Sequence, residues 1–421
     1  MDAAQKERLL SRGVVEIIDE SEFVNLLEAY RPLRLKVGFD PSAPDLHLGH
    51  AVLLRKLRQL QDLGHQVVII VGDWTAQIGD PSGRSAMRPM LTAAQVLENA
   101  ESYLEQFSKI VDRDKTEIRM QSEWFGPFTL TNVFELTSKF TVAQFLARED
   151  FSKRFKANQP IAITELLYPL LQGYDSVAVE SDVEFGGTDQ KFNLLVGRDM
   201  QRMMDQRPQQ CLLVPILVGT DGVRRMGKSL GNYIGLNEPP NDMYGKVMSL
   251  PDVSADPDPQ DGETGEERTR NTVLDYFDYL TDVPTAELAE LRDGLAAGTV
   301  NPMELKKRLA DELVAQFHDA DSARSARDHF ERTVQRRELP EDIPIYEISE
   351  ALDGKRVSDL LVSAGLAESS SAAKRLIDQG AVKKDGQPLT ANEPVTTIVD
   401  SSIVQVGRRR MVRATRPPKL G

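Results

Sequence analysis

A strand, a helix and a second strand follow one another between residues 33 and 73, and this order constrains the fold most. Residues 33–40, LRLKVGFD, alternate apolar and polar side chains with the two-residue period of a strand. Apolar residues then recur at helical spacing over 53–63, and Gly64 is suited to end that helix. Residues 66–73, QVVIIVGD, form an apolar run typical of a parallel strand buried on both faces. The order predicts an α/β fold with a Rossmann-like parallel sheet.

The turn between the first strand and the helix contains HLGH, residues 47–50. Ligands of open parallel sheets bind beyond the carboxyl ends of the strands, next to helix N-termini. Gly49 lets a phosphate approach the helix start, where free N–H groups and the helix dipole favour negative charge. His47 and His50 can then donate hydrogen bonds to phosphate oxygens. Two alternatives are helix-start histidines with no role and a zinc site, although further His or Cys ligands are missing nearby.

A second candidate phosphate-binding segment is VGTDGVRRMGKSLGN, residues 218–232, which we call the signature loop. It is rich in glycine and cationic, so Arg225, Lys228 and Ser229 can close over a polyphosphate. Taken alone, such a segment is also compatible with a plain surface loop. Together, HLGH and RMGKS about 175 residues later resemble the paired HIGH and KMSKS signatures of class I aminoacyl-tRNA synthetases.

A helical segment, AITELLYPLLQGYDSV, carries a polar face of unusual composition. Tyr168, Gln172 and Asp175 share one narrow face, and leucines fill the opposite side. A solvated face usually carries Lys and Glu, so this face predicts the wall of a ligand pocket rather than an ordinary amphipathic helix. Two glycine-flanked turns add Asp80 in IGDPSGRSAMR and Asp189 in FGGTDQKFN, for which plain turns are the alternative.

These segments, in this order, resemble the bacterial tyrosyl-tRNA synthetases over nearly the whole chain. The resemblance implies activation of L-tyrosine with Mg²⁺ and ATP as substrate, release of pyrophosphate, and transfer of the tyrosyl group to the terminal adenosine of tRNA(Tyr). It implies no resident metal site. A tryptophanyl enzyme, a simple nucleotidyltransferase and a non-catalytic RNA-binding paralogue are the alternatives.

The resemblance assigns roles to individual residues. Asp80, Tyr168 and Gln172 would hold the tyrosine ammonium group, Gln190 its carboxyl end, and Asp175 would accept the phenol hydroxyl, which phenylalanine lacks. Lys36 stands where the family often has Tyr; it either contacts the substrate or pairs with an acidic group near the pocket. The expected ATP-binding residues are Gly38, Asp40, His47, Gly49, His50, Gly187, Asp189 and Lys228. The expected catalytic residues are His47, His50, Arg84, Arg88, Arg225, Lys228 and Ser229.

We expect four regions along the chain. A catalytic domain with an insertion covers 1–235, a signature-loop exit and acidic loop 236–267, and a helical anticodon-binding domain 268–340. Residues 350–421 are similar to the S4 RNA-binding domain. Within 251–270, Pro, Asp and Glu predict a mobile loop or boundary.

Charge supports a nucleic-acid contact at the C-terminal end only. The 421 residues carry a net charge of -14, but the segment from Lys355 onward has 12 basic and 6 acidic residues, a net +6 that leaves -20 elsewhere. Lys374 and Arg375 on a predicted helix, with Lys383 and Lys384 in the next turn, can grip an RNA backbone.

The remaining composition indicates a cytoplasmic protein. Cys211 is the only cysteine, so no intrachain disulfide is possible. We find no signal-peptide pattern at the start and no apolar run of about 20 residues that would span a membrane. The family resemblance implies a homodimer, for which the apolar stretch 125–146 is the candidate interface.

Overall fold

The computed structural model describes residues 3–29, 31–41, 45–81, 92–255, 269–335, 343–407 and 410–416. The chain forms two compact units, residues 1–328 and 329–421. Within the described ranges, every helix is too short or too polar to cross a membrane.

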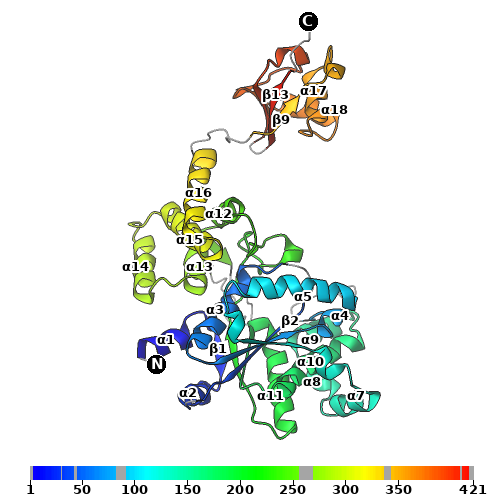
Figure 1. The fold of residues 1–421 in the computed structure, drawn as a ribbon, viewed down its shortest axis with the longest axis vertical. Helices are drawn as coiled ribbons and strands as arrows, with labels where there is room; N and C mark the ends of the chain where they lie inside the picture. Colours follow the sequence, from blue (N-terminus) through cyan, green and yellow to red (C-terminus); the bar gives the residue numbers. More distant parts are fainter. Residues whose placement is uncertain are drawn as a thin grey trace. The chain divides into compact units, whose positions relative to one another are not determined.

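A six-stranded sheet lies in the middle of the first unit, with the order β1-β6-β5-β2-β3-β4 (Figure 1). Neighbouring strands from β6 to β4 run parallel, and β1 is antiparallel to β6. The strands are β1 (Glu16–Ile18), β2 (Arg34–Phe39), β3 (Gln66–Val71), β4 (Thr116–Met120), β5 (Val183–Gly187) and β6 (Gln210–Val214). The predicted α/β fold with a Rossmann-like parallel sheet is confirmed, with an antiparallel edge strand that we did not predict.

Helix α3 (Leu48–Asp62) connects β2 to β3, as the pattern predicted. Leu54, Leu57 and Leu60 are fully buried on its inner side, and each contributes roughly 1.5–3 kcal/mol through burial. The helix ends just before Gly64, whose φ of 91° is the left-handed conformation that glycine adopts readily. His47 is the N-cap residue, so HLGH lies beyond the carboxyl end of β2.

Further helices accompany the sheet in the first unit (Figure 1). They are α1 (Ala3–Ser11), α2 (Glu20–Glu28), α4 (Thr75–Ile78), α5 (Ala93–Phe107), α6 (Ser122–Phe125), α7 (Leu130–Thr137), α8 (Val142–Leu146), α9 (Glu149–Lys156), α10 (Ile163–Ala178), α11 (Lys191–Met203) and α12 (Pro240–Met248). The described residues of this unit also form the short 3-10 turns η1 (Arg113–Lys115), η2 (Thr188–Gln190) and η3 (Lys228–Leu230). Helices α10 and α11 pack closely at Gly173, where a Cβ would lie 3.1 Å from Val196 Cγ1 and 3.3 Å from Gly197 N. A glycine at this position therefore sets the spacing of the two helices.

The predicted helices that follow are all present. They are α13 (Thr272–Leu280), α14 (Thr285–Ala296), α15 (Pro302–Phe317) and α16 (Ala320–Phe330). The loop predicted at 251–270 is partly wrong, because its ends pair as the antiparallel strands β7 (Val253–Ala255) and β8 (Thr269–Asn271). Residues 256–268 lie outside the described part of the chain.

The second unit has a five-stranded sheet with the order β11-β10-β12-β13-β9. Its strands are β9 (Ile345–Glu347), β10 (Val382–Lys384), β11 (Gln387–Pro388), β12 (Ser402–Val406) and β13 (Arg410–Thr415). Its helical segments are η5 (Glu331–Gln335), η6 (Glu350–Leu352), α17 (Val357–Ser363), α18 (Ser370–Asp378) and η7 (Val395–Thr397). Leu360, Ile377 and Val404 belong to a separate buried core. The turn predicted at Lys383 and Lys384 is wrong, since both residues lie on β10.

Candidate active site

The HLGH segment pairs through its backbone with residues 234–236, which lie just after the signature loop. Leu48 N donates to Ile234 O, and Leu236 N donates to Leu46 O, both at 2.9 Å. His47 also forms an isolated antiparallel bridge with Gly235. These contacts join segments that are far apart in sequence, so HLGH lies next to the end of the signature loop.

The two histidines form a compact pair at the start of α3. Their ring centroids lie 4.0 Å apart, and His47 N donates to His50 Nδ1 at 3.2 Å. A Cβ at Gly49 would lie 3.0 Å from the His47 ring, so a larger residue would press on the imidazole. Burial and the charge of Lys228 lower the pKa of both histidines, that of His50 to about 3. Both rings are therefore neutral at pH 7.

The cations of the signature loop have partners within the protein. Lys228 Nζ lies 3.0 Å from Tyr103 Oη and 4.9 Å from the centre of its ring. Arg225 Nη1 donates to Asp189 Oδ2 at 2.7 Å. Ser229 is exposed. The loop is thus linked to α5 and to the turn after β5.

Asn232 holds the two ends of the signature loop together. Its Nδ2 donates to Asp221 Oδ2 at 3.0 Å and to the Arg225 carbonyl at 3.1 Å, and its Oδ1 accepts from Gly227 N at 2.9 Å. A Cβ at Gly219 would overlap the Asn232 amide, so this glycine allows the close approach. Our reading of the sequence missed Asn232, although it stands within the motif SLGN.

The polar face of α10 is turned into the protein interior. Tyr168, Gln172 and Asp175 are all buried, and the Tyr168 hydroxyl donates to Asp40 Oδ2 at 2.8 Å. Burial and the neighbouring negative charge of Asp40 hold the pKa of Tyr168 well above its usual range, so its phenol stays protonated. Asp40 also accepts from Thr75 Oγ1 at 2.6 Å. The expected pocket wall is therefore tied to the carboxyl end of β2.

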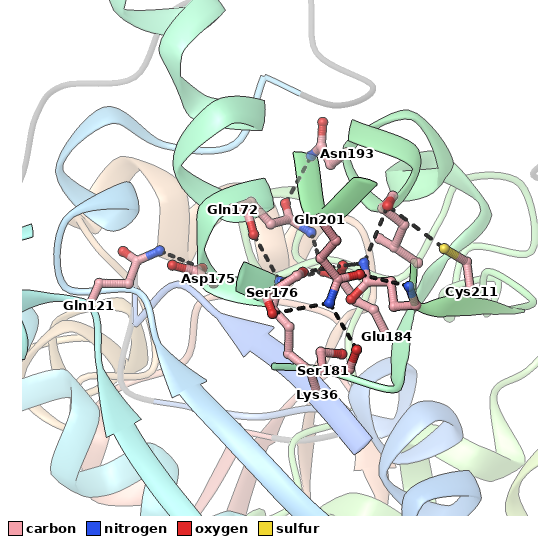
Figure 2. Close-up of polar contacts among 12 residues, drawn as sticks. Lys36, Gln121, Gln172, Asp175, Ser176, Ser181, Glu184, Asn193, Gln201 and Cys211 are labelled. Carbon is pink, nitrogen blue, oxygen red and sulfur yellow. Dashed lines mark hydrogen bonds and ion pairs between the residues drawn. The ribbon is translucent and has the colours of Figure 1, made fainter. Parts of the chain in front are cut away.

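Asp175 accepts hydrogen bonds from two side chains that sequence reasoning missed. Gln121 Nε2 donates to its Oδ2 at 2.8 Å, as Figure 2 shows, and Trp124 Nε1 donates to its Oδ1 at 3.1 Å. Asp175 is only 2% exposed, and burial raises its pKa to about 7. Gln121 directly follows β4 and lies at the carboxyl edge of the same sheet, a position that depends on sheet order and that the local sequence pattern did not reveal.

Lys36 takes the second of its two expected arrangements. Its Nζ donates to the Gln172 carbonyl at 2.8 Å, to Ser176 Oγ at 2.8 Å and to Glu184 Oε1 at 2.9 Å (Figure 2). Both Lys36 and Glu184 are fully buried. The expectation that Lys36 contacts the substrate directly is corrected here, because all three of its hydrogens already have acceptors in the protein.

The remaining expected residues lie as follows. Gln190 Nε2 lies 3.5 Å from Asp80 Oδ2, so the side chains of these two residues are neighbours. The space in front of Gly38 is open, since a Cβ there would meet no atom within 4 Å. At Gly187 a Cβ would lie 2.8 Å from Asp189 Oδ1. Arg84 and Arg88 lie outside the described residues.

The expected RNA-binding residues are gathered in the second unit. Lys374, Arg375 and Lys383 are exposed, and the half-buried Lys384 donates to the Thr397 carbonyl. Across the described residues, no group of three or more His, Cys, Asp or Glu side chains is arranged to hold a metal ion.

Comparison with known proteins identifies a family for each of the two units. The family described as tRNA synthetases class I (W and Y) matches residues 28–335, and the S4 domain matches residues 355–397. The chain is 55% identical over 408 residues to the tyrosine–tRNA ligase of Dehalococcoides mccartyi, covering 97% of this chain and 98% of the relative. It is 47% identical to that of Moorella thermoacetica over 416 residues, covering 98% and 96%.

Solved structures share the fold. The tyrosyl-tRNA synthetase of Archaeoglobus fulgidus in complex with L-tyrosine aligns with a TM-score of 0.59 at 24% identity, covering 77% of this chain and all of the other. That of Aeropyrum pernix aligns with a TM-score of 0.59 at 20% identity, covering 78% and 98%.

Proposed function

The chain belongs to the tyrosine–tRNA ligases among the class I tRNA synthetases, and on that premise we propose how its residues carry the reaction. The enzyme uses ATP to join tyrosine to tRNA. In the first step the tyrosine carboxylate attacks the α-phosphorus of ATP, which forms tyrosyl-adenylate and releases pyrophosphate. In the second step the tyrosyl group passes to the 3′-terminal adenosine of tRNA(Tyr), and AMP leaves.

One observation carries the assignment of the site. The HLGH segment is hydrogen-bonded through Leu48 to Ile234, just after the signature loop, and the charge of Lys228 in the loop acts on both His47 and His50. The first step needs no general base, because the carboxylate is already a nucleophile. The protein must orient the two substrates and stabilise the charge that develops on the phosphates. Neutral imidazole donors and the cations of the loop are suited to that role.

The phosphate-binding residues act as donors and cations. His47 and His50 each donate one N–H to phosphate oxygens at the start of α3, where the helix dipole adds to the attraction. Arg225 and Lys228, with Ser229, move from their present partners to the departing pyrophosphate. Arg84 and Arg88 complete the proposed set. Mg²⁺ enters with ATP as part of that substrate.

The nucleotide is held by backbone and carboxylate groups. Gly38, Asp40 and Gly49 line the base and phosphates, where the space in front of Gly38 is open. Gly187 and Asp189 meet the ribose. Because Asp189 is paired with Arg225, a ribose hydroxyl that binds Asp189 competes with the loop cation.

Tyrosine is held at both of its ends. Asp80, Tyr168 and Gln172 bind the ammonium group, Gln190 lies near the carboxyl end, and Asp175 accepts the phenol hydroxyl. Gln121 and Trp124 fix the Asp175 carboxylate, whose oxygens still have lone pairs for a third donor. A substrate without the hydroxyl leaves this buried carboxylate short of a donor, which is a strong basis for rejecting phenylalanine.

The other regions serve tRNA binding and assembly. We propose that 1–235 is the catalytic domain, that 236–267 leads out of it, and that 268–340 binds the anticodon region. Residues 350–421 bind RNA through Lys374, Arg375, Lys383 and Lys384. We further propose a homodimer in the cytoplasm, with the exposed apolar side chains of Leu130, Phe134 and Val142 in the interface.

Amino-acid-dependent exchange of pyrophosphate into ATP tests the proposed function. We expect exchange with tyrosine that exceeds exchange with phenylalanine or tryptophan by at least about 10³-fold in kcat/KM. Exchange that depends on tryptophan would identify the tryptophanyl alternative. Exchange with no amino-acid dependence would overturn the assignment of the site.

A further inference from the structure

A buried ion pair lies directly beneath the pocket wall and takes no part in the proposed chemistry. Lys36 on β2 and Glu184 on β5 are register partners of two parallel strands, with 2.9 Å between Nζ and Oε1. Neither side chain is exposed. Charges that leave water lose several kcal/mol of hydration each, and a well-packed apolar pair is often as stable. A buried pair of this kind is therefore poorly explained by stability alone.

The Glu184 carboxylate organises its surroundings by accepting from four donors. Its Oε1 accepts from Lys36 Nζ at 2.9 Å and from Gln172 Nε2 at 3.0 Å. Its Oε2 accepts from Ser176 Oγ at 3.1 Å and from Gln209 Nε2. Figure 2 shows Lys36, Gln172 and Ser176 gathered around Glu184. The carboxylate is thus fully satisfied without any contact to a ligand.

The fold keeps space for this cluster at one glycine. A Cβ at Gly197 of α11 would lie 2.8 Å from Gln209 Nε2, 2.9 Å from Ser176 Oγ and 3.2 Å from Glu184 Oε2. Any larger residue at this position would displace the polar groups. The glycine is thus matched to the ion pair and to its hydrogen-bond partners.

The pair acts on the two α10 residues that face the substrate. Lys36 binds the Gln172 carbonyl and Ser176 Oγ, each at 2.8 Å, and Asp175 lies between these two points in the sequence. The Gln172 side chain is fixed as well, since its Nε2 donates to Glu184 and its Oε1 accepts from Asn193 Nδ2 at 3.0 Å. Lys36 therefore fixes the backbone of α10 at Gln172, and Glu184 and Asn193 fix the orientation of the Gln172 amide.

We propose that the Lys36–Glu184 pair is a positioning device for substrate specificity: it fixes the orientation of Gln172 and Asp175, and so determines the discrimination between tyrosine and phenylalanine. This inference rests on the proposed function. Lys36 is a positioning residue and touches no substrate. Instead of contacting the substrate, Lys36 supports Asp175, the residue that we propose accepts the phenol hydroxyl.

Lys36 also favours the ionised form of Asp175. Burial raises the pKa of Asp175 to about 7, and the positive charge of Lys36 opposes that rise, as do the hydrogen bonds from Gln121 and Trp124. Glu184 is the negative group that acts in the opposite direction, and the protonated Tyr168 lies along the same helix. Of the charged pair, Lys36 has the larger effect. Removing both charges therefore moves the pKa of Asp175 upward.

The test replaces the pair with neutral residues of similar size in the full-length enzyme. In Lys36→Met/Glu184→Gln, we expect kcat/KM for tyrosine to fall at least about tenfold while that for phenylalanine changes little. The acid limb of kcat/KM for tyrosine should also move to higher pH, an effect that loss of packing alone would not produce. Both values come from amino-acid-dependent pyrophosphate exchange.

A matched control pair lies nearby. Arg154 of α9 and Glu165 at the start of α10 form another buried ion pair, with 2.5 Å between Nη1 and Oε2. Arg154→Met/Glu165→Gln should lower thermal stability. It should change neither the ratio of kcat/KM for tyrosine to that for phenylalanine nor the acid limb of kcat/KM for tyrosine. Ser176→Ala removes one Lys36 acceptor while keeping both charges, and it should lower the ratio about two- to threefold.

The outcomes separate the inference from the proposed function. A wild-type enzyme without tyrosine-dependent exchange would overturn the function itself. A tyrosine-specific wild type whose folded double variant keeps both the ratio and the pH limb would overturn the role of the pair alone. If the double variant does not fold, Ser176→Ala decides, and an unchanged ratio in that variant contradicts the inference.

Discussion

Arg225 of the signature loop donates to the carboxylate of Asp189, with 2.7 Å between Nη1 and Oδ2. Both side chains are about one-third exposed, so the pair contributes at most about 1 kcal/mol. Asp189 is also the residue that we assign to the ribose. ATP can therefore break this contact at little cost, and the loop cation then becomes available to the phosphates.

Lys228→Ala should lower the rate of tyrosyl-adenylate formation by about 10² or more and leave the Kd for tyrosine nearly unchanged. The reason is that Lys228 acts on charge that develops only in the transition state. Rapid-quench or stopped-flow measurement of a single turnover gives both values. The control is Tyr103→Phe, which keeps the ring under Lys228 and removes only its hydroxyl contact. An unchanged rate in Lys228→Ala would remove the loop from the mechanism.

Asn232→Ala should lower the same rate by about tenfold, because the loop loses the amide that joins Gly227 to Asp221. Tyrosine binding should not change, since the Asn232 side chain lies within the loop. Asn232→Asp is a useful comparison, because the new carboxylate keeps an acceptor for Gly227 N but repels the carboxylate of Asp221. Equal rates for wild type and both variants would show that the loop is held in place by other contacts.

Deletion from residue 345 onward should leave tyrosine activation intact and lower tRNA charging by about tenfold or more. The cut removes β9 together with its partner β13, and the second unit has its own core. A full-length control is Lys374→Glu/Arg375→Glu, which reverses two exposed charges and should also weaken charging. Loss of pyrophosphate exchange in the folded, truncated enzyme would contradict this division of labour.

Phe134→Glu should convert the proposed dimer into a monomer. Phe134 is 62% exposed and lies near Leu130, which is 67% exposed, so a charge here would be buried without a partner on assembly. Light scattering after gel filtration measures the mass directly. Val15→Glu is the control, because it also replaces an exposed apolar side chain, but on another part of the first unit. A wild-type monomer would refute the proposed interface.

Local patterns were enough to predict the elements that position the site. The alternation in β2 and the apolar run in β3 gave two parallel strands, and helical spacing gave α3 and α10 with Tyr168 and Asp175 on one face. These features depend on neighbours within one element, so periodicity reveals them. The pairing of HLGH with the signature loop as two signatures of one site came from family resemblance rather than from periodicity.

Partners from distant segments could not be read from such patterns. Gln121 and Trp124 reach Asp175 only because β4 pairs with β3 at the edge of the sheet. Lys36 contacts Glu184 because β5 pairs with β2 on the side opposite to β3. Sheet order is a long-range property that one sequence does not reveal.

A local signal for β10 was missed. Asp385 and Gly386 have φ values of 50° and 83°, as in the tight hairpin turn that an Asp-Gly pair favours. This turn would have placed Lys384 on a strand.

The central claim is that Asp175 reads the phenol hydroxyl of tyrosine. Its side chain already accepts from Gln121 and Trp124, so Trp124→Phe is the matched control that removes a donor without removing the carboxylate. Because Trp124 only helps to fix the carboxylate, we expect its loss to lower the tyrosine to phenylalanine ratio of kcat/KM less than Asp175→Asn does.

The most direct test measures kcat/KM for tyrosine and for phenylalanine in wild type and Asp175→Asn by pyrophosphate exchange. Asparagine keeps the shape and one acceptor but removes the charge, so tyrosine should lose about 1.5–3 kcal/mol of transition-state binding, roughly 10- to 150-fold, and phenylalanine much less. The ratio should therefore fall at least about tenfold. A change of both values by the same factor would show that Asp175 does not read the hydroxyl and would contradict the account.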